Sequence, residues 1–335
     1  MKQLNIGYMM SCFKSMDKKV MLEKAKAISQ ITHKPLILVL SDMAFCAMRY
    51  GSGYMDYYLF EMYNMTNKQR NTLVTRRRNN QLVKQYNNPD YMHFFENKNE
   101  FNTIFQKYLN REWVDVTENS KSDIIDFIKR HKTFMVKPIN TCCGQGIRKI
   151  KMPESLKLPD IEQFYGKLIS SEYHYIIEEV IKQHPLLDTM CPYSINTVRV
   201  VTLIKNEKVN IICAFFRIGN GKCVDNFNNG GMLVRVDEKN GILISNAVNK
   251  NKKVFENHPI TNTKIKGFAL PDWEKVKELC ISASQVLPQI KYIAWDICFT
   301  PNGPYIVEGN EYPGYDIYQI PEHIPDKKGL WERFK

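Results

Sequence analysis

The stretch that most constrains the fold is AWDICFTPNGPYIVEGN, residues 294–310, in which two strand-like runs flank an Asn-Gly turn. This pattern is typical of a β-hairpin. Because side chains alternate between the two faces of a strand, Glu308 and Asn310 share one face. If the turn is centred near Asn302, Asp296 lies roughly opposite Glu308. The three polar side chains are then expected to meet on one side of the hairpin.

Two carboxylates that face each other on neighbouring strands repel by up to about 1 kcal/mol, so we expect a positive group between them. An exposed polar face of an antiparallel hairpin would carry such acids without any function. A magnesium site is the alternative, because Mg²⁺ takes oxygen ligands and commonly binds one or two carboxylates together with nucleotide phosphates. The hairpin alone does not decide between these interpretations.

The composition is that of a globular protein, since 44% of the 335 residues are hydrophobic, enough for two or three packed units. The longest apolar run lies near PLILVL, residues 35–40, and is well short of the roughly 18 residues of a membrane-spanning helix. Residues 1–20 lack the apolar core of a signal peptide. The nine cysteines, an odd number without zinc-like spacing, are expected to be reduced thiols. We therefore expect a cytoplasmic protein.

The net charge of +12 is unevenly distributed along the chain. Residues 1–136 hold 21 Lys and Arg against 13 Asp and Glu, so this part contributes 21 − 13 = +8. The run TRRRNNQLVKQ at 75–85 could attract nucleic acid, anionic lipid or an acidic sugar polymer. Solvated surface is the commoner role of such a run, and both interpretations stay open.

The pattern along the chain predicts an α+β protein with antiparallel sheets, preceded by a mostly helical region at 1–95. Within that first region KPLILVLS, residues 34–41, reads as a strand, and the aromatic-rich MDYYLFEMYNM at 55–65 reads as an amphipathic, core-forming stretch. Helices are expected at 96–110, 121–131, 160–171 and 271–287, and strands at 132–139, 148–152, 173–182 and 196–218, with a turn near Asn206.

Two further motifs carry charge at strand ends. KPINTCCGQGIRKI places Lys137 before a loop with Gly144 and Gly146, and loop glycines let backbone N–H groups approach a phosphate. A plain hairpin with glycines in its turn explains the same letters. In YIIEEVI an apolar strand ends in Glu178 and Glu179, which need partners if they are buried. They could lie near a base or sugar, or end the strand at solvent.

In this order the motifs resemble the ATP-grasp superfamily: a lysine strand with a glycine loop, a Glu-Glu hinge, and a late Asp, Glu and Asn set. The resemblance becomes more specific in QHPLLDTMCPYSINTVRVVTL, NFNNGG, WDICFTPNGPYIVEGN and the leading YGSGYMDYYLFEMYNM. Together these look like the sugar-transfer-associated ATP-grasp proteins of surface-polysaccharide gene clusters, from about residue 50 to about 320. The resemblance implies an ATP-grasp fold, with two α+β subdomains clasping ATP at 96–182 and 183–335.

The resemblance also implies roles for individual residues. The ligands of the ATP phosphates would be Lys98 and Lys137, with a covering loop of Gly144, Gln145 and Gly146. The adenine would be framed by Glu178, Glu179 and the backbone at Val180. The ligands of Mg²⁺ would be Asp296, Glu308 and Asn310. The acceptor would lie under the NFNNGG segment, at Asn226, Asn228, Gly230 and Gly231.

One departure concerns an arginine that many ATP-grasp ligases have two residues before the metal aspartate, where this chain has Ala294. The cation that stabilises the transition state must then come from elsewhere. Arg199 and Arg217, both on predicted strands, are the catalytic candidates, and a surface ion pair is the alternative for either. The loop TCCGQG is also poorer in glycine than is usual in the family.

The resemblance implies an ATP-dependent carboxylate–amine ligase that uses ATP and Mg²⁺ and passes through an acyl phosphate. Its expected partners are an acidic sugar or glycan and an amine donor, without nucleic acid or a transmembrane segment, and with room for peripheral contact with a membrane-linked glycan. A kinase that phosphorylates a sugar hydroxyl is the second hypothesis. A non-catalytic polyanion-binding protein is the third, and it has no use for the Asp296, Glu308 and Asn310 set.

Overall fold

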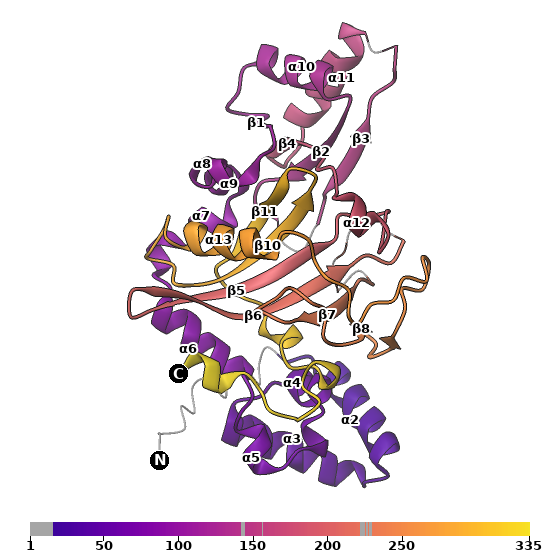
Figure 1. The fold of residues 1–335 in the computed structure, drawn as a ribbon, viewed down its shortest axis with the longest axis vertical. Helices are drawn as coiled ribbons and strands as arrows, with labels where there is room; N and C mark the ends of the chain where they lie inside the picture. Colours follow the sequence, from indigo (N-terminus) through magenta and orange to yellow (C-terminus); the bar gives the residue numbers. More distant parts are fainter. Residues whose placement is uncertain (1–15, 142–144, 156, 222–224, 226, 228–229) are drawn as a thin grey trace. The chain divides into compact units, whose positions relative to one another are not determined.

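A computed structural model describes residues 16–141, 145–155, 157–221, 225, 227 and 230–335. Its contacts divide the chain into two units, Met1–Gln85 together with Pro313–Lys335, and Tyr86–Tyr312 (Figure 1). The sequence placed the start of the second region near residue 96, whereas the contacts place it at Tyr86 and return the last segment of the chain to the first unit.

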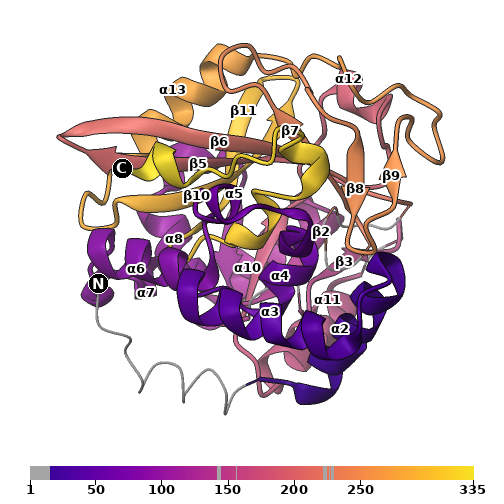
Figure 2. The ribbon, with the colours of Figure 1, turned by 90° about the horizontal axis from the view of Figure 1, so that it is seen from below.

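The first unit is helical throughout its described part, and α2, α3 and α4 lie side by side (Figure 2). Its core contains Ala25, Ile28, Val39, Met43 and Cys46. The helices are α2 (Lys18–Thr32), α3 (Leu36–Tyr50), α4 (Tyr54–Leu59), η1 (Met62–Asn64), α5 (Asn67–Arg70), α6 (Arg76–Tyr86), η4 (Tyr315–Ile317), η5 (Pro321–His323) and η6 (Trp331–Phe334).

The predicted strand at 34–41 is wrong, because these residues begin helix α3. Pro35 occupies the N-cap position, and leucine, methionine and alanine, which favour helices, make up much of α3. Val39, Met43 and Cys46 are buried at helical spacing. A short apolar run does not by itself distinguish a buried strand from a helix. Here the buried positions continue at helical spacing as far as Tyr50, which is the pattern of a helix.

The second unit contains two antiparallel sheets. The four-stranded sheet has the order β1-β4-β2-β3, and α10 and α11 pack on it around Phe127, Phe134 and Ile161 (Figure 1). The elements of the chain from Pro89 to Glu179 are η2 (Pro89–Tyr91), α7 (His93–Glu96), α8 (Lys98–Ile104), α9 (Gln106–Leu109), β1 (Trp113–Asp115), α10 (Lys121–Arg130), β2 (Thr133–Pro138), β3 (Arg148–Lys151), α11 (Leu158–Ile169) and β4 (Tyr175–Glu179).

The seven-stranded sheet has the order β11-β10-β5-β6-β7-β8-β9. Its core side packs against α13 and the aromatic helices α7 to α9, around Trp295, Phe105 and Val276. Its elements are α12 (Pro185–Asp188), β5 (Thr197–Lys205), β6 (Lys208–Ile218), β7 (Met232–Val236), β8 (Ala247–Asn249), β9 (Val254–Phe255), α13 (Trp273–Ser284), β10 (Tyr292–Thr300) and β11 (Gly303–Asn310). The α+β architecture with antiparallel sheets and a helical N-terminal region is therefore confirmed.

The described cysteines agree with a reduced state. The five cysteines that the structure describes are all free and buried: Cys46, Cys191, Cys213, Cys280 and Cys298.

Candidate active site

The hairpin of β10 and β11 has the predicted register. Asp296 pairs directly with Glu308, and Ala294 pairs with Asn310 across the two strands. Asp296 also pairs with Arg199 on β5, the other neighbour of β10. The acid, its predicted metal partners and a guanidinium group therefore lie on adjacent strands of one sheet.

Gly309, between Glu308 and Asn310, is required by packing rather than by a turn. A Cβ at Gly309 would lie 2.8 Å from Cε1 of Phe95 and 3.0 Å from Cε2 of Phe101. Those rings belong to the apolar core beneath the sheet. The close approach of the backbone to these rings fixes the two polar residues on either side of the glycine.

Asp296 is the centre of a buried ion-pair network. Nε and Nη2 of Arg199 donate to its two carboxylate oxygens at 2.7 and 2.8 Å, and Nη1 of Arg217 donates to Oδ2 at 2.5 Å. The side chains of Asp296, Arg199 and Arg217 are 2%, 16% and 12% exposed, so this is no surface ion pair. Burial alone would raise the pKa of Asp296, but the two guanidinium groups outweigh it and hold the pKa well below its usual range.

Glu308 differs from Asp296 in its surroundings. Its side chain is exposed. The neighbouring protein groups displace part of the water around its carboxyl group and so raise the pKa of Glu308, and the Asp296 carboxylate beside it raises the pKa further. The like charges predicted from the sequence thus do oppose each other, and Arg199 and Arg217 supply the positive charge expected near them.

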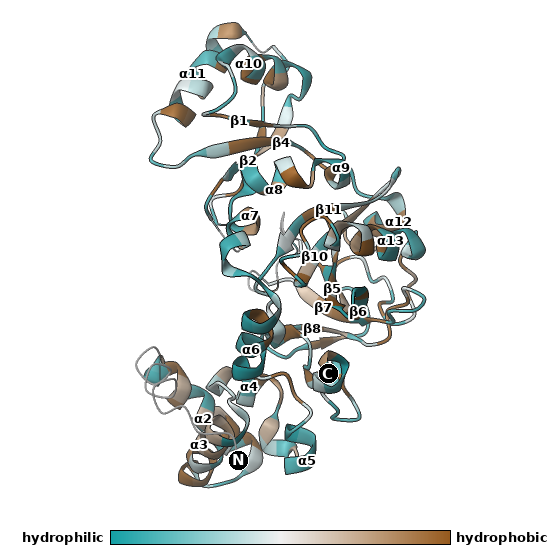
Figure 3. Cartoon of the chain, turned by 90° about the vertical axis from the view of Figure 1, so that its left-hand side faces the viewer, coloured by the Kyte–Doolittle hydropathy of each residue, from teal (hydrophilic) through white to brown (hydrophobic). Residues whose placement is uncertain are grey.

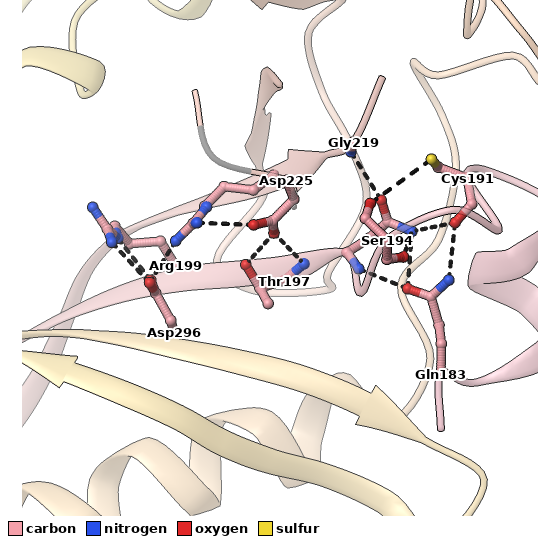
Figure 4. Close-up of polar contacts among 10 residues, drawn as sticks. Gln183, Cys191, Ser194, Thr197, Arg199, Gly219, Asp225 and Asp296 are labelled. Carbon is pink, nitrogen blue, oxygen red and sulfur yellow. Dashed lines mark hydrogen bonds and ion pairs between the residues drawn. The ribbon is translucent and has the colours of Figure 1, made fainter. Parts of the chain in front are cut away.

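Asp225 holds Arg217 from the other side and was missed by the sequence analysis (Figure 4). Its Oδ1 accepts from Nη2 of Arg217 at 2.8 Å, and its Oδ2 accepts from the backbone N and the hydroxyl of Thr197 at 2.9 and 2.5 Å. Burial raises the pKa of Asp225 although Arg217 opposes this. Asp225 immediately precedes NFNNGG, so it links Arg217 to the predicted acceptor segment. An acid next to a predicted loop motif was the only sequence signal for it.

A second network fixes the ends of β5 and β6 (Figure 4). The side chain of Gln183 donates to the carbonyl of Cys191 at 3.0 Å and accepts from the backbone N of Asn196 at 2.6 Å. The side-chain oxygen of Asn196 accepts from the backbone N of Gly219 at 3.1 Å. A Cβ at Gly219 would lie 2.0 Å from Oγ of Ser194, so a larger residue here would require the Ser194 side chain to move. The network locks the strand ends that carry Thr197 and Arg217.

The predicted phosphate lysines come from two elements, since Lys137 lies on β2 and Lys98 begins α8. Nζ of Lys137 contacts Oε2 of Glu178 at 2.5 Å, and Nζ of Lys98 donates to the carbonyls of Ile139 and Thr141 at 3.2 and 2.5 Å. Gly146 has a φ of +73°, and a Cβ there would lie 2.8 Å from Cγ of Pro138. The glycine is therefore needed for the loop to fold back over the end of β2.

The side chain of Glu178 is buried and forms an ion pair with Lys137. Its side chain is 3% exposed, and it accepts from Nε of Arg111 at 2.9 Å and from Nδ2 of Asn102 at 3.0 Å in addition to Lys137. Burial would raise the pKa of Glu178, but Arg111 and Lys137 lower it below its usual range. Glu178 thus holds Lys137 in place. Glu179 ends β4 and Val180 follows it, and the contact with adenine stays a prediction for Glu178, Glu179 and Val180.

Arg111 connects the two sheets of this unit and was also missed. Its side chain is 2% exposed. Besides Glu178 on β4, its Nη1 and Nη2 donate to the carbonyls of Ile306 and Val307 on β11 at 2.8 and 3.0 Å. A continuous chain of contacts therefore leads from Lys137 through Glu178 and Arg111 to the residue next to Glu308. No sequence spacing signals such a long-range partner.

The remaining predicted residues lie in two segments of the second unit, 144–145 and 226–231. Gly144, Asn226 and Asn228 lie outside the described residues. Gln145 is exposed, and its carbonyl accepts from the hydroxyl of Thr141 at 3.0 Å. Gly230, with a φ of +98°, is exposed, and Gly231 is buried.

Within the described part of the chain, no group of three His, Cys, Asp or Glu side chains could hold a metal ion alone. Two carboxylates and the amide of Asn310 nevertheless fit Mg²⁺, which commonly completes its coordination with phosphate oxygens and water. Both carboxylate oxygens of Asp296 already accept from Arg199 and Arg217, whereas Glu308 is exposed, so a magnesium ion that arrives with a nucleotide stays a prediction for this set.

Comparison with known proteins gives the family. A sequence model of the sugar-transfer-associated ATP-grasp family matches residues 77–334. No curated protein matches the chain. Solved structures with a similar fold include D-alanyl-alanine synthetase A from Vibrio cholerae (17% identity, 72% of this chain, 63% of that chain, TM-score 0.43). The D-alanine–D-alanine ligase from Helicobacter pylori is another (14% identity, 72% of this chain, 60% of that chain, TM-score 0.41).

A third is an N5-carboxyaminoimidazole synthase from Aspergillus clavatus (9% identity, 71% of this chain, 51% of that chain, TM-score 0.41). This chain thus matches less than two thirds of the length of these proteins. At such low identities and TM-scores they add nothing to the assignment, which rests on the family model covering most of the chain. The chain belongs to the sugar-transfer-associated ATP-grasp family.

Proposed function

We propose that the protein is an ATP-dependent carboxylate–amine ligase that attaches an amino acid or amine to a uronic acid or similar acidic sugar in surface-polysaccharide assembly. The observation that carries the proposal is the convergence of Asp296, Glu308 and Asn310 with two guanidinium groups on one face of the sheet. The sugar part rests on the family description.

In the proposed reaction a carboxylate oxygen of the acceptor attacks the γ-phosphorus of ATP, forming an acyl phosphate and releasing ADP. The amine nitrogen then attacks the acyl carbon, inorganic phosphate leaves, and the amine loses a proton to give the amide. Glu308, Asn310 and Asp296 would hold Mg²⁺, which offsets the charge of the polyphosphate. Lys137 and Lys98 would bind the phosphates, with Gly146 in the loop that covers them.

Negative charge grows on the transferred phosphoryl group and then on the tetrahedral oxygen of the second step. Fixed guanidinium groups stabilise such charge better than mobile ones, because they need no reorganisation during the reaction. Arg217 is held between Asp225 and Asp296, and Arg199 is held by Asp296. This pair is proposed to replace the arginine that is absent at Ala294.

The protein needs no nucleophile of its own in this scheme. Cys191 and His258 are both buried, and the pKa of Cys191 is lowered to about 7 because bonds to His258 and to the backbone outweigh the effect of burial. The thiol lies in the network that locks the strand ends, beside Ser194. Its role there is structural.

The test is ADP formation together with product mass, for a panel of uronic-acid glycans and nucleotide sugars offered with mixed amino acids. Inorganic phosphate plus a product that carries an amide supports the ligase. A stable phosphoester would instead support the kinase, which uses the same ATP site. Polyanion binding without any ADP formation would contradict both enzymatic hypotheses.

A further inference from the structure

Helix α3 of the first unit is apolar on two faces, and the residues that the structure describes cover only one of them. Val39, Met43, Cys46 and Tyr50 form the buried face. The opposite side carries the α3 surface, which consists of Ile37, Leu38, Phe45 and Met48, with exposed fractions of 68%, 57%, 39% and 46%. A helix that is apolar all round is normally enclosed on all sides, so the exposed side calls for a partner.

Helices α2 and α3 both carry hydrophobic residues (Figure 3), and in α2 the side chain of Ile31 is 64% exposed. Residues 37, 41, 45 and 48 follow helical spacing, with the small Ser41 between the apolar side chains, so these form a stripe along the helix rather than scattered single residues. Single exposed apolar residues are ordinary on protein surfaces, whereas a contiguous stripe marks an interaction site.

Basic residues frame this stripe. Lys34 and Arg49, at the two ends of α3, are exposed, and Nη2 of Arg77 lies 3.1 Å from the carbonyl of Arg49. The one acid of α3, Asp42, is turned to the protein, where Arg70 donates to it at 2.6 Å and Tyr57 at 2.6 Å. Residues 16–85 contain 12 Lys and Arg against 5 Asp and Glu, so their net charge is 12 − 5 = +7.

We infer that the α3 surface docks onto a lipid bilayer that contains anionic lipid. An apolar stripe framed by lysine and arginine is what a helix lying in the membrane interface presents. A second copy of the chain would bring two surfaces of the same positive sign together, and a nucleic acid would not need the apolar stripe. Anionic lipid satisfies both features at once.

The helix lies on the bilayer and does not cross it. No single helix among the described ones is long and apolar enough to span a membrane, although α2 and α3, bent by 117°, pass that test together. The 15 residues of α3 extend about 22 Å, less than the roughly 30 Å of a hydrocarbon core. Its other face is occupied by the core of the first unit.

The inference is independent of the ligase chemistry, and it would bring an enzyme of polysaccharide assembly close to a lipid-linked acceptor. The test uses the full chain with two sets of vesicles, phosphatidylcholine alone and phosphatidylcholine with phosphatidylglycerol, in a sedimentation assay. We expect binding to the anionic vesicles that weakens with added salt, since the basic residues are screened.

Ile37→Glu should lower the vesicle partition coefficient by roughly tenfold or more, because it removes a large apolar side chain from the lipid. Lys34→Glu should lower it by about fivefold or more for anionic vesicles only. The matched control is Ile169→Glu on α11 of the other unit, where the side chain is 47% exposed. That control should bind as the wild type does, and circular dichroism should show all three variants folded.

Three outcomes would overturn the inference: no binding of the wild type to anionic vesicles, equal loss in Ile169→Glu, or a wild-type dimer that Ile37→Glu dissociates. The last would mean that a second copy covers the α3 surface. ATP turnover of Ile37→Glu in vesicle-free buffer is expected to equal that of the wild type. A failed ligase assay and a failed lipid assay can therefore be told apart.

Discussion

Replacing the two acids of the hairpin one at a time separates metal binding from structural support. Glu308→Gln removes a charge that is exposed and faces the Asp296 carboxylate. The free energy of unfolding should stay within about 1 kcal/mol of the wild type or rise, because like-charge repulsion is relieved. ADP formation at saturating Mg²⁺ should fall roughly 10²-fold or more, since a ligand of the ion is lost.

Asp296→Asn should behave differently, because Asp296 is both a predicted ligand and the partner of Arg199 and Arg217. Removing one member of a buried ion pair commonly costs about 3–5 kcal/mol, so this variant should lose stability as well as turnover. A residue that only bound a metal could be replaced without loss of stability, and the ion pairs of Asp296 are the reason to expect such a loss.

The assay combines urea unfolding without nucleotide with a Mg²⁺ titration of ADP formation, and Glu278→Gln on exposed helix surface is the control. Wild-type Mg²⁺ dependence in Glu308→Gln would refute the metal assignment. An Asp296→Asn variant that unfolds at the wild-type urea concentration would refute the structural reasoning.

Three further experiments test other residues of the second unit. Lys137→Ala should weaken ATP binding at least about tenfold and adenosine binding little, as measured by calorimetry. The control Lys132→Ala, which replaces an exposed lysine of a surface ion pair, should bind both ligands normally. Equal losses of affinity for ATP and adenosine in Lys137→Ala would mean that Lys137 has only a structural role. Arg217→Lys or Arg199→Lys should lower kcat roughly tenfold or more with little change in ATP affinity, and full activity in both would exclude the proposed role. Burial raises the pKa of Glu311 to about 7, so its contribution to stability is present below about pH 4.5 and lost as the pH rises through 7. Glu311→Gln should therefore reduce the fall in unfolding free energy between about pH 5 and pH 8, and an unchanged fall would contradict that assignment.

Local patterns predicted much of the second unit. The alternation predicted the pair of Asp296 and Glu308, and this pair is present. The strands turn at Pro301 and Asn302, so that Thr300 pairs with Gly303, and a β-bulge beside Asp296 restores the predicted pair. The helix α3 was misread since a short apolar run fits both strand and helix. The sequence did not reveal three residues of the site: Arg111, Asn102 and Asp225. The first two bind Glu178, which is far from them in the sequence. The third binds Arg217, and this pairing depends on how the chain packs.

Arg111 ties the two sheets of the second unit together. Its guanidinium group binds Glu178 on β4 and two carbonyls of β11. Hydrogen bonds in which a charged group takes part contribute roughly 1.5–3 kcal/mol each. Pulling the sheets apart at that point would break these bonds together, so one buried side chain fastens the strand that carries Glu178 to the strand that carries Glu308.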